Sequence, residues 1–158
     1  MRNGIIMNYE QLNRTLESLT DGVPYIISNL ANASALIFDS LEGLNWAGFY
    51  ISRDNGDLYL GPFQGKTACI EIPLGKGVCG TAASLMKTVV VPNVHEFEGH
   101  IACDSASNSE IVIPVMVRGK VFGVLDIDSV VFDRFKNEDR AGLEEFVGIL
   151  EKRIEKGI

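Results

Sequence analysis

The sequence is poor in cysteine, in histidine and in basic side chains, and each shortage excludes a class of protein. Three cysteines in 158 residues, an odd count, do not fit the disulfide framework of a small secreted protein. The two histidines, His95 and His100, do not form a zinc-binding pattern, so we expect no metal site. Lys plus Arg number 14 against 21 Asp plus Glu, a net charge of −7. That balance argues against a nucleic-acid partner, which requires basic clusters to bind phosphates.

Long hydrophobic runs are also missing from this sequence. No stretch has the roughly 20 apolar residues that a membrane span needs, so we expect no membrane partner. Residues 1–10 hold one arginine with no apolar run behind it, and this predicts no signal peptide and a cytoplasmic location. In a reducing compartment the cysteines are interpreted as working thiols rather than structural bridges. Whether residues 1–6 precede a native start at Met7 stays open.

The order of predicted elements indicates an α+β fold. At 158 residues the chain has the size of one domain, so residues 1–158 are expected to form a single domain with residues 1–8 as a flexible N-terminus. Hydrophobic spacing predicts an antiparallel sheet with helices packed mainly on one face. The predicted helices cover residues 9–19, 23–41 with Pro24 in the first turn, 82–86, and 137–155 capped by Asn137. The predicted strands cover residues 45–51, 57–63, 69–73, 89–91, 110–117 and 120–128, with turns at 54–56 and 118–119.

The three cysteines occupy different predicted settings. Cys103 lies in a polar part of the irregular stretch 93–109, Cys69 at a strand start and Cys79 in a glycine-rich turn. A loop thiol can act as a nucleophile or redox group. The alternative is a small buried apolar residue, an interpretation favoured for Cys79 and not for Cys103. The turn at 75–80 lacks the spacing of a phosphate-binding P-loop and predicts a turn that enters a helix.

Three acids and two aromatic residues are further candidates. Asp126 and Asp128 alternate on one strand and therefore share a face, which Glu110 on the neighbouring strand can join. Such a group suits a cationic or zwitterionic ligand and can supply a proton; the alternative is a strand end that reaches solvent. Trp46 and Tyr50 also point to one face, and spacing alone favours ordinary core positions for both.

Several segments together resemble one family, the free methionine-(R)-sulfoxide reductases, which are stand-alone GAF-domain enzymes. The resemblance runs from the second predicted helix to the C-terminus. A glycine-valine-leucine-aspartate strand is common to GAF domains, whereas the cysteine-bearing segments are more specific. The segments are residues 45–50 (Asn-Trp-Ala-Gly-Phe-Tyr), 60–65 (Leu-Gly-Pro-Phe-Gln-Gly), 75–80 (Gly-Lys-Gly-Val-Cys-Gly), 99–104 (Gly-His-Ile-Ala-Cys-Asp) and 123–128 (Gly-Val-Leu-Asp-Ile-Asp).

The resemblance implies thiol-dependent reduction of free methionine (R)-sulfoxide without a cofactor. It implies that Cys103 is the nucleophile, that Cys69 is the resolving thiol that forms a disulfide with it, and that thioredoxin reduces this disulfide. Cys79 matches a third cysteine of secondary role. The remaining matches are Glu110, Asp126 and Asp128 around the sulfoxide and amino group, and Trp46 and Tyr50 near the methylthio end.

A second class of function stays open from the residues alone, namely a GAF module that binds a small molecule or senses redox state without turnover. The sequence shows no effector domain for a sensor to control, and a sensor does not need three acids beside a loop thiol, so the enzyme is the favoured hypothesis. The physiological reductant and the oligomeric state stay open, with a homodimer among the alternatives.

Overall fold

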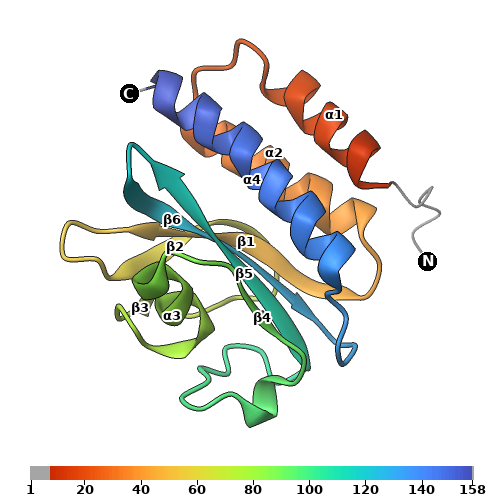
Figure 1. Ribbon diagram of the computed structural model, residues 1–158, viewed down its shortest axis with the longest axis vertical. Helices are drawn as coiled ribbons and strands as arrows, with labels where there is room; N and C mark the ends of the chain where they lie inside the picture. The colour runs from red at the N-terminus through yellow and green to blue at the C-terminus, as the bar shows by residue number, and fades with distance from the viewer. Residues whose placement is uncertain (1–7, 158) are drawn as a thin grey trace.

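Two long helices cover one face of a sheet and a third packs against their outer side, while a short helix with a long loop covers the other face (Figure 1). The computed structural model describes residues 8–157. The predicted α+β class, with helices mainly on one face, is confirmed. The helices are α1 (Tyr9–Thr20), α2 (Ile26–Ser40), α3 (Gly77–Leu85) and α4 (Asn137–Gly157), and the strands are β1 (Leu44–Ser52), β2 (Leu58–Gly65), β3 (Glu71–Ile72), β4 (Val89–Val91), β5 (Ser109–Val117) and β6 (Lys120–Ser129).

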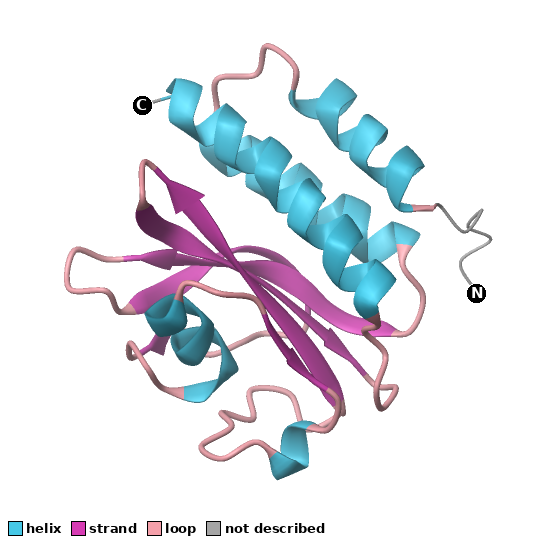
Figure 2. Ribbon diagram, in the orientation of Figure 1, coloured by secondary structure: helices cyan, strands magenta, loops and turns pink. Residues whose placement is uncertain are grey.

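The sheet is antiparallel, with strand order β3-β2-β1-β6-β5-β4. The predicted turns at 54–56 and 118–119 join β1 to β2 and β5 to β6 (Figure 2). In the second turn, Arg118 and Gly119 both have positive φ, 52° and 76°. Two successive left-handed residues match the twist of the flanking strands and fix the β5–β6 register.

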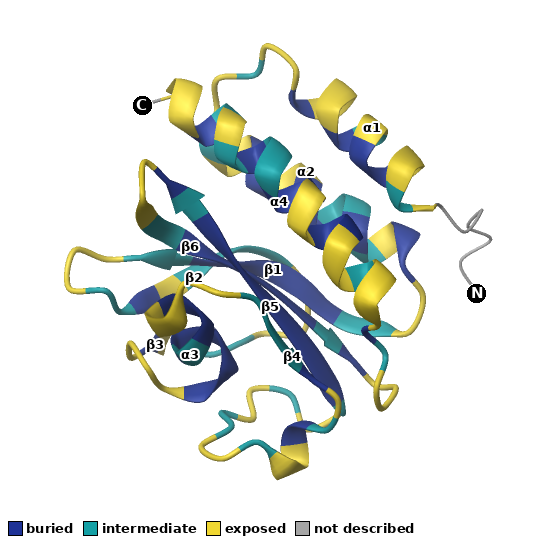
Figure 3. Cartoon of the chain, viewed as in Figure 1, coloured by how far each residue is buried: buried dark blue, intermediate teal, exposed yellow. Residues whose placement is uncertain are grey.

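Each face of the sheet carries its own apolar core. Side chains alternate along β6, so Leu125 and Ile127 join the core under α1, α2 and α4, while Val124 joins a second core under α3. Asp126 belongs to the α3 side by the same alternation, although it is buried. Most of β5 and β6 is buried (Figure 3). The polar residues of interest therefore lie on the less heavily covered face.

The predicted starts of α2 and α4 are wrong. Helix α2 begins at Ile26, so Pro24 lies before the helix rather than in its first turn. Tyr25 is extended, and the Asn29 side chain donates a hydrogen bond to the Val23 carbonyl, which holds this segment outside the helix. Asn137 is the first helical residue of α4 rather than its cap.

The residue before α4 is instead held by a carboxylate one turn later. The Lys136 N–H donates to Asp139 Oδ2 at 2.8 Å, and the Lys136 carbonyl accepts the first helical hydrogen bond, from the Arg140 N–H at 3.0 Å. An acidic side chain at this end is favourable because the helix dipole is positive there.

The segments around the cysteines also differ from their predicted form. Strand β3 is limited to Glu71–Ile72. Before it, the Cys69 carbonyl accepts a hydrogen bond from the Tyr50 hydroxyl. Helix α3 begins at Gly77, so the glycine-rich turn is its first turn. The stretch 93–109 is irregular as predicted except for a 3₁₀ turn, Val94–Glu96, and Ser109, which already belongs to β5.

Candidate active site

A disulfide joins Cys69 to Cys103 across 34 residues of sequence, with their Cα atoms 5.8 Å apart. Cys69 follows β2 and is half-buried, whereas Cys103 is exposed in the loop between the 3₁₀ turn and β5. The pairing implied by the family resemblance is therefore confirmed. Since disulfide exchange requires access to the sulfur atoms, the position at the surface suits a bond that is broken and remade.

Cys79 is separated from these two thiols by burial. It lies in the first turn of α3 and is 4% exposed. The helix approaches the preceding turn so closely that a Cβ at Gly80 would lie 2.6 Å from the Pro73 carbonyl oxygen, which is why only glycine fits there. Burial, together with the negative charge of Asp126, raises the pKa of the Cys79 thiol well above its ordinary value. A buried neutral thiol is a weak nucleophile.

Glu110, Asp126 and Asp128 converge on the α3 side of the sheet, as the strand pattern predicted. Glu110 pairs with Asp128 across β5 and β6, and Asp126 lies two positions along on the same face. The alternative of a strand end that reaches solvent is wrong, because Glu110 and Asp126 are each 6% exposed. One carboxylate oxygen of Asp126 and one of Asp128, the Oδ1 atoms, are buried without a hydrogen-bond partner.

Burial raises the pKa of all three carboxyl groups well above the ordinary range. The next cause is the negative charge of a neighbouring acid, namely Asp128 for Glu110, Glu110 for Asp126 and Asp126 for Asp128. Such groups keep protons at pH values where exposed carboxyls have lost them. The cluster can therefore donate a proton, or ionise when a cation arrives.

We expect Asp126→Asn to stabilise the disulfide-bonded protein at about pH 8 by about 1–3 kcal/mol. Because the folded pKa is raised, this group's stabilising contribution is fully present below the ordinary carboxyl pKa and is lost as the pH rises toward the folded value. An asparagine side chain cannot ionise, so the variant lacks this loss of stability at high pH. Its gain in the free energy of unfolding should therefore vanish near pH 4, and urea unfolding at both pH values measures it.

Asp104→Asn is the matched control. The Ala106 N–H and the Asn45 side chain donate to the Asp104 carboxylate and lower its pKa, so its contribution is present above the ordinary pKa and is lost as the pH falls. This variant should lose stability at high pH. A gain for both variants would contradict the interpretation of the cluster.

Trp46 and Tyr50 are at once core residues and pocket walls. They are 3% and 2% exposed, their rings stack with centroids 5.9 Å apart, and Trp46 also stacks on Phe63 at 5.2 Å. The indole Nε1 donates to the Lys66 carbonyl and the Tyr50 hydroxyl to the Cys69 carbonyl. Both bonds fix the β2–β3 connection, which carries Cys69, against the sheet.

A small cavity of about 30 Å³ brings these groups together. Trp46 and Tyr50, Cys79, Cys103 and the three acids all line it. A water molecule needs roughly 10–15 Å³ in such a cavity, so in this disulfide-bonded state the space suits a few waters and not an amino acid.

Among residues 8–157, no helix has the length and apolarity of a membrane span.

His100 also lines the cavity, although the sequence offered it no role beyond the rejected zinc pattern. Its Nε2 lies 3.6 Å from Glu110 Oε1, and both side chains are largely buried. Burial lowers the pKa of His100, which favours the neutral ring. The feature of the sequence that could have pointed to His100 as a site residue is its position three residues before Cys103 in the same loop.

Comparison with known proteins places this geometry in a family. The GAF domain model matches residues 15–154. The free methionine-R-sulfoxide reductase of Escherichia coli is 53% identical over 91% of this chain and 87% of its own length. The chain belongs to the free methionine-R-sulfoxide reductases. These enzymes are oxidoreductases, and the family predicted from the cysteine-bearing segments is confirmed.

Solved structures of this reductase family have the same fold. The Staphylococcus aureus enzyme in complex with its substrate is 50% identical, covers 93% of this chain and 95% of its own, and superposes with a TM-score of 0.89. The Neisseria meningitidis reductase with substrate is 38% identical, covers 99% of this chain and 98% of its own, and gives a TM-score of 0.92.

Proposed function

We propose that this protein reduces the R epimer of free methionine sulfoxide to methionine, with Cys103 as nucleophile, Cys69 as resolving thiol and thioredoxin as reductant. The observation that carries the proposal is the Cys69–Cys103 disulfide beside a cavity that also holds three buried acids. A thiol pair supplies the two electrons that the reaction needs, and the acids supply the proton. A reducing compartment such as the cytoplasm suits such a reaction.

In the first step the Cys103 thiolate attacks the sulfoxide sulfur. The sulfur–oxygen bond breaks, the sulfur is reduced by two electrons and methionine leaves, while the oxygen and a proton remain on Cys103 as a sulfenic acid. Because the oxygen must be protonated to leave, the neutral carboxyls of the cluster are suitable donors. Glu110 is the best placed of them, since His100 lies next to its carboxyl group.

In the second step the Cys69 thiol attacks the sulfur of the sulfenic acid. A disulfide forms and water leaves, which gives the covalent state of the structure described above. Thioredoxin then attacks the disulfide through its own thiolate and returns both cysteines to the thiol form. The exposure of Cys103 provides the access that this exchange requires.

The remaining groups suit the two ends of the substrate. An ammonium group beside Asp126 and Asp128 would offset their mutual repulsion and draw them into the ionised form. Trp46 and Tyr50 offer an apolar wall for the methylthio group. The same acids disfavour a peptide-bound residue, whose amide nitrogen carries no positive charge.

A coupled assay tests the proposal. Purified protein with thioredoxin, thioredoxin reductase and NADPH should oxidise NADPH when free methionine (R)-sulfoxide is added, and the S epimer should support little oxidation. Absence of NADPH oxidation with coupling enzymes that reduce a control disulfide would favour a non-catalytic GAF module. If glutaredoxin supports turnover and thioredoxin does not, the proposed reaction stands and the proposed reductant is wrong.

We expect Cys79→Ser to keep most of the thioredoxin-coupled turnover. Cys79 is buried and its pKa is raised, so it supplies little thiolate for either chemical step. Steady-state rates of the variant and the wild type measure this directly. A loss as complete as that of Cys103→Ser would give Cys79 a primary role and demote Cys69.

A further inference from the structure

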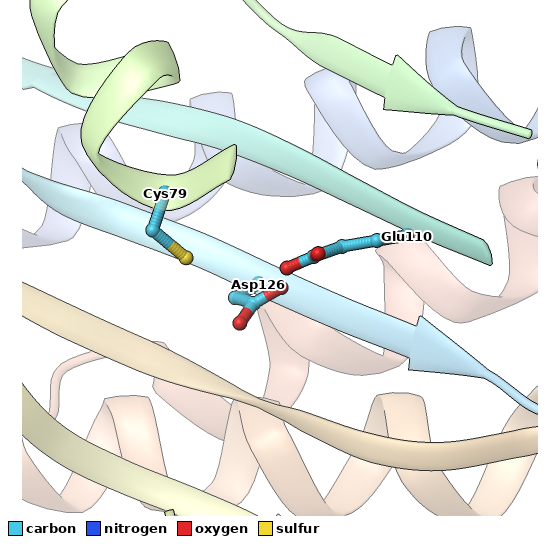
Figure 4. A group of neighbouring side chains, drawn as sticks. All are labelled: Cys79, Glu110 and Asp126. Atoms are coloured by element: carbon cyan, nitrogen blue, oxygen red, sulfur yellow. The ribbon is translucent and has the colours of Figure 1, made fainter. Parts of the chain in front are cut away.

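Cys79, Glu110 and Asp126, which all line the cavity, form a compact group of potential metal ligands (Figure 4). One ligand atom from each residue, a thiol sulfur or a carboxylate oxygen, lies within 4.8 Å of the others, and all three residues are buried. They come from α3, β5 and β6. Sequence spacing predicted that Glu110 and Asp126 share a face but gave no sign that Cys79 joins them, because the packing of α3 on the sheet brings the thiol there.

The ligand chemistry of the group is mixed rather than purely acidic. A thiolate with two carboxylates suits a borderline-soft divalent ion such as Zn²⁺ or Co²⁺ better than Mg²⁺ or Ca²⁺, which prefer oxygen alone. A second observation points to a bound cation. Asp126 is 6% exposed, and its Oδ1 has no hydrogen-bond partner among the described residues. An acceptor left in this condition costs free energy that a cation would recover.

We infer that Cys79, Glu110 and Asp126 form an inhibitory binding site for a thiophilic divalent cation, of which Zn²⁺ is the physiological candidate. The site goes beyond the proposed reaction, which needs no metal. A metal ion held there occupies the acids that would receive the substrate's amino group. Metal and methionine sulfoxide are therefore mutually exclusive ligands of one pocket.

Binding exchanges protons for the ion. The three ligands must give up their protons, because only a thiolate and ionised carboxylates bind the metal. The dipositive charge then stabilises the three negative charges that burial alone disfavours. Metal affinity should therefore rise with pH, and binding should release protons to the buffer.

Cobalt titration of a double variant tests the site without any use of turnover. Cys69→Ser combined with Cys103→Ser leaves Cys79 as the single thiol of the chain and removes the disulfide. Co²⁺ should then produce a saturable thiolate-to-metal charge-transfer band in the near ultraviolet, which Zn²⁺ should bleach by displacement and a chelator should abolish. Free methionine should weaken Co²⁺ binding competitively.

Two further substitutions in the same background separate a built site from a lone thiol. Asp126→Asn should weaken Co²⁺ binding by more than about 10-fold. Asp104→Asn, which changes a partnered carboxylate that lines the same cavity, should leave it unchanged. No charge-transfer band at saturating Co²⁺, or a band equally strong in Asp126→Asn, would overturn the inference. Adding Cys79→Ser should abolish the band.

Discussion

Cys103→Ser should abolish methionine formation even in a single turnover, whereas Cys69→Ser should still release about one methionine per enzyme. A serine hydroxyl at position 103 is not ionised near neutral pH and lacks the polarisability of a thiolate, so it cannot attack the sulfoxide sulfur. Cys69 enters only afterwards, and its loss leaves the first step intact. Quenched-flow measurement of methionine, on fully reduced enzyme with no reductant added, separates these outcomes.

The same pair of variants tests recycling. With thioredoxin present, Cys69→Ser should turn over slowly, because the favoured disulfide cannot form. Cys79 is the matched comparison, since Cys79→Ser removes a third thiol that is buried rather than exposed. A full equivalent of methionine from Cys103→Ser together with none from Cys69→Ser would reverse the two assignments.

The pocket should reject N-acetylmethionine (R)-sulfoxide, with kcat/KM lower than that of the free amino acid by about 10³-fold or more. The acetyl group removes the positive charge of the substrate, so Asp126 and Asp128 face a neutral amide with carboxylate oxygens that already lack partners. Buried groups left unpaired in the complex are the strongest source of discrimination. Parallel thioredoxin-coupled rates on both substrates measure the ratio.

Asp126→Asn is the control for this specificity. If the discrimination is electrostatic, this substitution should lower kcat/KM for the free amino acid much more than for the acetylated one. The ratio of the two kcat/KM values should then shrink. An unchanged ratio would assign the rejection to the size of the cavity alone. Comparable turnover of both substrates by the wild type would contradict the proposed role of the acids.

The fold could be predicted from the sequence where local patterns decide it. Alternation along β1 and β6 and the Arg118–Gly119 turn determine faces and register, and these predictions are confirmed. The predicted convergence of Glu110 with Asp126 and Asp128 followed from the same period-two logic. The predicted helix boundaries were wrong where single side-chain hydrogen bonds decide where a helix begins, as at Asn29 and Asp139.

Features of the site that depend on distant contacts could not be predicted in the same way. Nothing local shows that Trp46 serves core and cavity at once, or that His100 reaches Glu110, because these contacts join loop and sheet across the fold. The burial of Cys79 was the favoured interpretation of its segment, but its closeness to Asp126 appears only when α3 packs on the sheet. The Cys69–Cys103 pairing was available from the family resemblance alone.

The disulfide has a kinetic consequence beyond electron storage. It ties the loop that carries Cys103 to the β2–β3 connection, and in this state the cavity has room for a few waters only. In the reaction proposed above, methionine sulfoxide would therefore bind only after the reductant has opened the disulfide. Substrate and reductant would act on alternate forms of the enzyme, in a ping-pong order, and excess substrate would not compete with the reductant for the oxidised form.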